Sequence, residues 1–335
     1  MNIEKRLKEL EINPTRKFEF KETNYIAKSV AEKLADNVHG LENSYNELYM
    51  RIYNCNMSYA QIATIFGNAV YFYPNNTLYF DEKFDITKFD EKVVNECIHY
   101  LQNFRRFDGS KQRIGVCNFA EFKIYGLGLN EAVTLYLAAK AVGEKPHRKN
   151  NEKISIYTIN DNYYPYLTSL VIQLLFFVGD KNLIKSIFNG TEEFENDLYN
   201  TFEEETKKIL NKFDDILDEN NKTVRGEDKI IDMYLDAQKG ICTTYFNKIY
   251  SRMNTLQEVE ENTHKLNEYK NIYGNIIGIS KNDLSEYLEN MESKMNKKYI
   301  DLYAKQSRQS LIVVYQNKLS KLISKIAHWI ESKAQ

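Results

Sequence analysis

The sequence predicts an α+β fold that is mostly α-helical, with a small β-sheet or edge hairpin. Apolar residues recur at helical spacing along most of the 335-residue chain. Residues 69–80 instead combine aromatic and aliphatic side chains around a Pro-Asn-Asn turn, which is typical of two short strands. From about residue 191 onward, Glu, Lys and Asn accompany helical periodicity without a strand-like run. These three observations favour a helical N-terminal region, a mixed core and a C-terminal helical subdomain.

The first 68 residues predict the helical N-terminal region. Ile26, Val30 and Leu34 recur every four residues and mark one face of a helix. The Asn13-Pro14 pair ends an earlier helix, because proline cannot continue it. The helices are expected over residues 1–12, 23–40 and 44–54.

A hairpin follows, and a second helix then carries the motif on which the functional interpretation depends. Two strands are expected over residues 69–73 and 77–80. Asp85 or Thr87 is expected to cap the motif helix, which runs to about Phe104. Few other stretches have strand character, so the sheet should be small.

The motif helix contains the sequence Asn-Glu-Cys-Ile-His at residues 95–99. On a helix, Asn95 and His99 stand on one face with Glu96 beside them. This is the spacing of H-E-x-x-H, in which two histidines hold zinc and the glutamate activates a zinc-bound water. Here the first histidine is replaced by asparagine. Cys97 points away from that face and is expected in the core.

A glycine-punctuated stretch, residues 126–134, leads into a further helix that begins with Asn130-Glu131-Ala132 and runs to about Val142. An apolar helix is expected over residues 167–178, behind the two motif helices. The polar residues between these helices, 144–153, are expected to be exposed.

The order of a strand, an H-E-x-x-H-like helix and an Asn-Glu-Ala helix makes residues 71–179 resemble the gluzincins. These are thermolysin-like metallopeptidases whose third zinc ligand is a glutamate. The resemblance implies a zincin-like core over residues 69–190, followed by a C-terminal helical subdomain over residues 191–335. The alternative is that the motif is a coincidence, in which case His99 and Glu131 would lie far apart.

The resemblance also implies roles for individual residues. Glu96 matches the general base, and His99 and Glu131 match two of the metal ligands. Asn130 matches a residue that holds the imidazole of His99. Asn95 stands at the position of the missing ligand.

Contacts with a substrate are implied by the same resemblance. An extended peptide would pair with the strand at Thr77, Leu78 and Tyr79, which would form the edge of the cleft. Tyr164, or its neighbour Tyr163, would donate a hydrogen bond to the oxyanion.

Two departures from the family's pattern predict a degenerate site. Asn95 offers a neutral amide oxygen, which is a poor zinc donor. Leu135 replaces the acidic residue that supports the first histidine in the family. The expected cofactor is therefore none, or weakly bound zinc. A rescued zinc site would require His147 or Cys117 to supply the third donor.

Composition limits the partners. The chain has 45 Lys and Arg against 47 Asp and Glu, a formal charge of −2, which gives no reason to expect nucleic acid or a membrane as partner. The charged N-terminus is not a secretory signal, and the four cysteines are widely spaced. We therefore expect a cytoplasmic protein.

Three functions follow from these observations. The favoured one is a pseudopeptidase that binds a peptide or protein in the cleft without efficient hydrolysis. The second is an active zinc peptidase with an unusual ligand set. The third is a non-enzymatic helical interaction protein. No nucleotide-binding glycine motif is present in the sequence.

Overall fold

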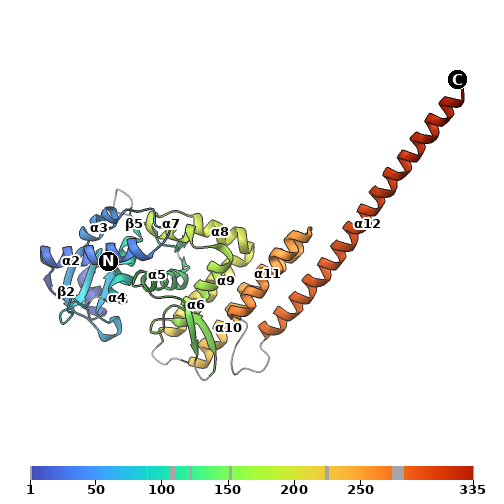
Figure 1. The fold of residues 1–335 in the computed structure, drawn as a ribbon. Coiled ribbons are helices and arrows are strands. Elements are labelled where there is room, and N and C mark those ends of the chain that lie inside the picture. Colours follow the sequence, from blue (N-terminus) through green and yellow to red (C-terminus); the bar gives the residue numbers. More distant parts are fainter. Residues whose placement is uncertain are drawn as a thin grey trace. The chain divides into compact units, whose positions relative to one another are not determined.

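The computed structural model is mostly helical, with 68% of residues in helices and several small sheets (Figure 1). The chain separates into two compact units, Met1–Tyr245 and Phe246–Gln335. The structure describes residues 2–88, 90–105, 111–120, 123–150, 153–222, 226–273 and 283–334.

The first unit contains all the strands that the structure describes and most of the helices. Its helices are α1 (Ile3–Glu9), α2 (Phe20–Asn37), α3 (Tyr45–Tyr53), α4 (Glu91–Leu101), α5 (Leu127–Ala141), α6 (Pro165–Val178), α7 (Lys181–Asn189), α8 (Glu193–Phe202) and α9 (Thr206–Asn220). Short 3-10 turns cover Thr64–Phe66 and Glu203–Glu205. The strands are β1 (Asn13–Lys17), β2 (Asn56–Gln61), β3 (Ala69–Phe72), β4 (Thr77–Asp81), β5 (Asn103–Arg105), β6 (Lys111–Ile114), β7 (Asn118–Ala120), β8 (Lys123–Tyr125), β9 (His147–Asn150) and β10 (Ser155–Thr158).

The main sheet has four strands in the order β1-β2-β4-β3. The predicted hairpin is confirmed, because β3 and β4 pair antiparallel, with Tyr71 opposite Leu78. β2 runs parallel to β4, and β1 pairs antiparallel with β2. Neither β1 nor β2 was expected. The residues of β1 are all exposed. The strand therefore lacks the alternation of apolar and polar residues by which a half-buried strand is recognised in a sequence.

Helix α4 lies against β3 and packs on α5, which in turn packs on α6. The predicted order of a hairpin, two motif helices and an apolar helix behind them is therefore found. Its cap differs from the prediction, because α4 begins at Glu91 and Asp90 accepts the backbone N–H of Val93 at 3.1 Å. Asp85 instead closes its own turn by accepting the backbone N–H and hydroxyl of Thr87.

Two segments without a strand-like pattern in the sequence contain strands. The segment after α4 carries β6 and β7, and the polar segment after α5 carries β9, which pairs with β10. These strands are short and rich in polar residues, so no hydrophobic run marks them in the sequence.

Helix α5 is almost entirely buried and begins at Gly126, whose φ is +81°. The carboxylate of Asp214 in α9 accepts the N–H of Gly128 at 2.7 Å and that of Gly126 at 3.1 Å. A Cβ on Gly128 would lie 2.2 Å from the carbonyl oxygen of Phe213, so α9 approaches at a distance that only glycine allows. The glycine pair thus couples α5 to α9.

The division between the units differs from the boundary predicted near residue 190. Helices α7, α8 and α9 belong to the first unit, because α9 packs on α5 and caps its N-terminus. A change in composition marks residue 191, but composition does not reveal which helices share a core.

The second unit comprises the end of α10 (Glu227–Arg252), α11 (Leu256–Tyr273) and α12 (Asp283–Ala334). Helix α11 packs on the start of α12, where Leu284, Leu288 and Met291 are buried. The helical spacing of Leu319, Leu322, Ile326 and Trp329 predicts that they face inward from a last amphipathic helix. This prediction is wrong for Leu319 and Leu322, which are 59% and 55% exposed. The side chains of Ile326 and Trp329 lie outside the described ones.

Among the described residues, no single helix combines the length and apolar content that a bilayer span requires. The pair α6 and α7 meets the criterion only as a combined segment, and it is bent by 116°.

Candidate functional site

A cavity of about 400 Å³ in the first unit collects most of the predicted site residues. Glu96 and His99 reach it from α4, and Asn130 and Glu131 reach it from α5. The remaining lining residues are Phe66, Val70, Tyr71, Tyr73, Lys92, Asn103, Ile114, Cys117, Leu127, Tyr164, Leu217 and Asn221. The structure therefore brings Glu96, His99 and Glu131 together.

His99 and Glu131 face each other, with Nε2 and Oε2 3.2 Å apart. Two helices hold this pair, because α4 packs directly on α5. Burial opposes a charge on His99, but the facing carboxylate of Glu131 outweighs it and raises the pKa of the imidazole. Burial likewise opposes the charge on Glu131, and the contact with His99 lowers the pKa of that carboxyl. The pair is thus an imidazole–carboxylate hydrogen bond that gains strength when both groups are charged.

The other ring nitrogen of His99 contacts Gln102, with Nε2 of Gln102 2.8 Å from Nδ1. An amide N–H that donates to Nδ1 leaves the proton of a neutral imidazole on Nε2, where it faces Glu131. Gln102 is fully buried at the C-terminal end of α4. It holds the imidazole, which is the role that the resemblance assigns to Asn130.

Asn130 has a different partner. Its Oδ1 accepts the backbone N–H of Val116 at 3.0 Å. Gly115, with φ +50°, lies so close that a Cβ there would be 2.1 Å from Asn130 Oδ1 and 2.4 Å from Gln102 Oε1. The predicted contact between Asn130 and His99 is therefore replaced by one that ties α5 to the segment over the cavity.

Both carboxylate oxygens of Glu96 contact a neighbouring group. Lys92 Nζ lies 2.5 Å from Oε1, and the backbone N–H of Tyr71 in β3 donates to Oε2 at 2.7 Å. Burial opposes the charge on Lys92, but Glu96, with a further contribution from Glu131, raises the pKa of the ammonium. Lys92 therefore places a permanent positive charge between two buried carboxylates.

Asn95 is fully buried and is not among the residues that line the cavity. Its Nδ2 lies 3.4 Å from Glu96 Oε1. Its Oδ1 is buried without a hydrogen-bond partner among the described residues. The asparagine at the position of the missing ligand is thus packed beneath the site.

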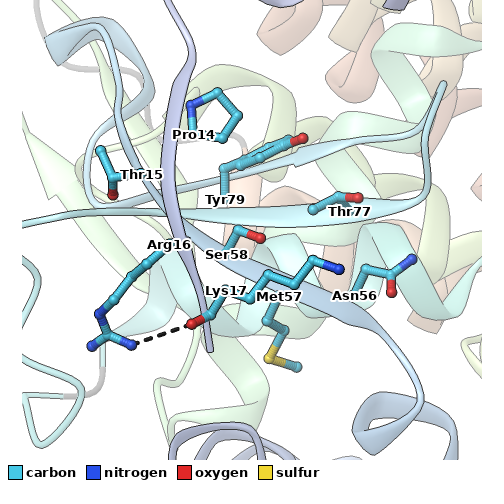
Figure 2. Close-up of a pocket in the computed structure, with 9 residues that line it drawn as sticks. All are labelled: Pro14, Thr15, Arg16, Lys17, Asn56, Met57, Ser58, Thr77 and Tyr79. Atoms are coloured by element: carbon cyan, nitrogen blue, oxygen red, sulfur yellow. Dashed lines mark hydrogen bonds between the residues drawn. The ribbon is translucent and has the colours of Figure 1, made fainter. Parts of the chain in front are cut away.

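Thr77, Leu78 and Tyr79 do not form the predicted edge of the cleft. They lie on β4, whose backbone is paired on one side with β2 and on the other with β3. No edge remains there to which a peptide could add. The side chains of Thr77 and Tyr79 line a different pocket, together with Arg16, Met57 and Ser58 (Figure 2). That pocket has no carboxylate, imidazole or thiol among its lining residues.

The strand that borders the cavity is β3, at the edge of the four-stranded sheet. Val70 and Tyr71 of β3 both line the cavity. The prediction of an edge strand beside the motif helix thus applies to the first strand of the hairpin and not the second.

Tyr164 also lines the cavity, and its hydroxyl donates to Asn221 at 2.7 Å. It adopts a φ of +47° at the residue before α6. Tyr163 is 40% exposed, and its ring lies 5.9 Å from Lys92 Nζ. The role of Tyr164 as an oxyanion donor stays a prediction.

The residues present do not fit a zinc site of the resembled family. His99 and Glu131 have a spacing suited to two ligands on one ion, but a third strong donor is missing. Cys117 lines the cavity, yet burial raises the pKa of its thiol to about 12, which opposes the thiolate that zinc requires. His147 lies on β9 and contacts Asp161. Within the described ranges, no three His, Cys, Asp or Glu side chains are grouped to hold a metal.

Two site residues were not predicted from the sequence, namely Lys92 and Gln102. Lys92 precedes Glu96 by four residues, and Gln102 follows His99 by three, so both lie on the motif's face of the helix. This position on the motif's face is the only feature of the sequence that could have indicated Lys92 and Gln102. Charged and polar residues at this spacing are so common on helices that the spacing does not identify a site residue.

Comparison of the chain with models of protein families, with curated proteins and with solved structures found no match.

Chemically, the cavity combines a pair that can exchange a proton, His99 and Glu131, with a neutralised carboxylate, Glu96. Apolar and aromatic side chains form much of the remaining wall. Such a cavity suits the binding of a partly apolar ligand with a few polar groups.

Proposed function

We propose that this protein is a metallopeptidase-like binding protein. It holds a peptide or protein segment in the cavity between α4, α5 and β3 and does not hydrolyse it efficiently. One observation carries the proposal: the residues that match a zinc peptidase's base and two of its ligands share one cavity, and the ammonium of Lys92 supplies the cation there.

The charges of the cavity support binding without a metal. In a gluzincin, a divalent ion balances the carboxylates around it. In this chain, the ammonium of Lys92 balances Glu96, and the Nε2–H of His99 donates to Glu131. A zinc ion would meet the ammonium at close range, which disfavours its binding by charge repulsion, and it would have to displace the proton between His99 and Glu131.

The state of Glu96 supports the loss of efficient hydrolysis. A general base must accept a proton from the attacking water. The ammonium of Lys92 contacts Oε1, and the backbone N–H of Tyr71 donates to Oε2. Both oxygens of Glu96 are therefore already engaged, and a water molecule would have to displace one of these contacts to be activated there.

The walls of the cavity favour a peptide as the ligand. Phe66, Val70, Ile114, Leu127 and Leu217 provide apolar surface for a side chain. β3 lies beside this surface at the edge of the sheet, the place where an extended backbone can align.

One observation favours the second candidate, an active peptidase with an unusual ligand set. The buried Oδ1 of Asn95 has no hydrogen-bond partner among the described residues, and such an oxygen gains free energy when it contacts a cation. This candidate predicts peptide cleavage that a chelator blocks and that Glu96→Gln abolishes.

The test is a screen of labelled peptides against the full chain with and without a chelator, read by fluorescence anisotropy and mass spectrometry. We expect peptides with apolar side chains to bind intact. Leu127→Asp, at the cavity, should weaken binding at least about tenfold, because it places a charge in an apolar wall.

Met50→Asp is the matched control, because Met50 is exposed on α3 and does not line the cavity. It should leave peptide binding unchanged. Cleavage of a bound peptide that disappears with chelator and in Glu96→Gln would overturn the proposal in favour of the active enzyme. Equal loss of binding in the two Asp variants would place the peptide outside the cavity.

A further inference from the structure

Helix α12 is one long continuous helix (Figure 1). The burial of its apolar side chains changes along its length. At its start Leu284, Leu288 and Met291 are buried against neighbouring helices of the second unit. Further along, apolar residues are exposed to solvent. We call residues 302–330 the distal segment. Its exposed apolar residues, between 49% and 70% accessible, are Tyr303, Leu311, Ile312, Val313, Val314, Tyr315, Leu319, Leu322 and Ile323.

Exposed apolar surface on this scale marks a binding surface, because isolated apolar residues are normal but contiguous patches are not. Ile312, Leu319 and Ile323 are spaced by seven and four residues, so they share one side of the helix. Lys318, Lys321 and Lys325 are spaced by three and four residues and lie together on another side. Within residues 311–325, the three lysines therefore lie on the side of the helix opposite Ile312, Leu319 and Ile323. Lys305 and Arg308 precede Ile312 by seven and four residues, so they lie on the same side as Ile312, two turns and one turn before it.

The distal segment also differs in charge from the start of the helix. Residues 283–301 contain both acidic and basic side chains. Between Asp301 and Glu331 the sequence has no Asp or Glu, and its basic residues are Lys305, Arg308, Lys318, Lys321 and Lys325. A helix that exposes apolar side chains and carries only basic charges is complementary to a surface with an apolar interior and an anionic exterior.

We propose that the distal segment of α12 lies on the surface of an anionic phospholipid membrane. Leu319, Ile323 and their neighbours enter the boundary between headgroups and acyl chains, and the lysines pair with lipid phosphates. The segment lies in the plane of the surface and does not cross the bilayer. This proposal replaces the expectation, based on the net charge of the whole chain, that no membrane is involved.

A second copy of the chain is the competing occupant, and charge disfavours it. Another distal segment would bring the same apolar face but also the same basic residues, with no carboxylate between Asp301 and Glu331 to pair with them. An anionic lipid surface supplies the opposite charge at every lysine. Charge complementarity therefore selects the membrane.

The chain has its own probe for the test, because Trp329 is the only tryptophan in the sequence and belongs to the distal segment. The full chain is titrated with vesicles of phosphatidylcholine alone and with vesicles containing about one third phosphatidylserine. We expect a blue shift of the tryptophan emission and co-flotation of the protein with the anionic vesicles only. Added salt should reverse both, because lysine–phosphate attraction is screened.

Three double variants make the test specific. Lys321→Glu/Lys325→Glu should weaken vesicle binding at least about tenfold. Lys294→Glu/Lys297→Glu changes the net charge equally but at exposed positions near the start of α12, so it should bind like the wild type. Leu319→Asp/Ile323→Asp should abolish the blue shift, and circular dichroism of all variants shows whether the fold is retained.

Three results would overturn the proposal. One is equal binding to neutral and anionic vesicles, and another is the absence of binding to both. The third is a concentration-dependent oligomer without lipid that Leu319→Asp/Ile323→Asp dissolves, which would assign the face to a second copy.

Discussion

At the scale of single residues, the site depends on how its charges are balanced. Lys92, Glu96, His99 and Glu131 are clustered on two helices, and each charged group has a partner of opposite charge within about 3 Å. Such an arrangement is stable without an ion from solution, but it depends on every partner. Removing one leaves an opposite charge buried.

Lys92→Met should therefore destabilise the fold by about 3 kcal/mol, because it leaves the carboxylate of Glu96 buried without its cation. Urea unfolding monitored by circular dichroism measures the change. The control is Lys28→Met, which removes an exposed pair with Glu32 at 3.8 Å and should cost less than about 0.5 kcal/mol. Equal losses of unfolding free energy in the two variants would show that the Lys92–Glu96 pair stabilises the fold no more than an exposed ion pair does.

The His99–Glu131 pair predicts a specific dependence of stability on pH. The pKa of His99 is raised, so its contribution is complete below about 6.5 and is lost as pH rises through the folded value. The pKa of Glu131 is lowered, so its contribution is complete above about 4.5 and is lost as pH falls through the folded value. The pair is therefore most stabilising between these pH values.

His99→Asn should remove this dependence, and the free energy of unfolding should then change less between pH 6 and 8. Glu131→Gln should have a similar effect on that slope. Chemical unfolding at a series of pH values measures it. An unchanged slope in both variants would contradict the assignment of the pair.

At the scale of elements, helix α5 is the central helix of the first unit, on which α4, α6 and α9 pack. It carries Glu131 and Asn130, packs on both α4 and α6, and receives its N-terminal cap from α9. The position of Glu131 thus depends on a carboxylate more than 80 residues further along the chain.

Asp214→Ala should destabilise the fold by about 2 kcal/mol, because the N–H groups of Gly126 and Gly128 lose a charged acceptor at a helix N-terminus. Asp215→Ala is the matched control, since the neighbouring side chain is exposed and should change stability by less than about 0.5 kcal/mol. Thermal unfolding compares the two. A larger loss for Asp215→Ala would contradict the capping role of Asp214.

Elements with a strong local signal were predicted well from the sequence. The hairpin, α4, α5 and α6 combine periodic apolar residues with turn or capping residues, and they appear within a few residues of their expected bounds. β1 and β2 were missed because their pairing is long-range, and α9 was assigned to the wrong unit for the same reason. The cap at Asp90 shows how several acidic candidates before one helix look alike in a sequence.

The proximity of three candidate residues was expected from the sequence, but their partners were not. The resemblance of the two motifs to those of gluzincins implied that Glu96, His99 and Glu131 converge. The ammonium of Lys92, the amide of Gln102 and the edge position of β3 depend on which groups meet in space. No local pattern encodes those contacts.

At the scale of the whole molecule, the two units have different kinds of surface. The first encloses a cavity, and the second extends an exposed amphipathic helix. The two proposals accordingly assign a separate partner to each unit, a peptide to the cavity and an anionic membrane surface to the helix.

Hydrogen exchange without lipid should reflect this difference. The amides of α5 should exchange slowest, because the helix is almost fully buried, and those of the distal segment should exchange fast. Mass spectrometry of peptic fragments measures both. Strong protection of the distal segment in lipid-free protein would mean that another part of the chain or a second copy already covers it.

The most direct measurement is the zinc content of the purified full chain by inductively coupled plasma mass spectrometry. The account predicts far less than one zinc per chain in the wild type, and uptake of zinc by Asn95→His/Lys92→Met, in which a third ligand is added and the competing cation is removed. One tightly held zinc per wild-type chain would contradict the account.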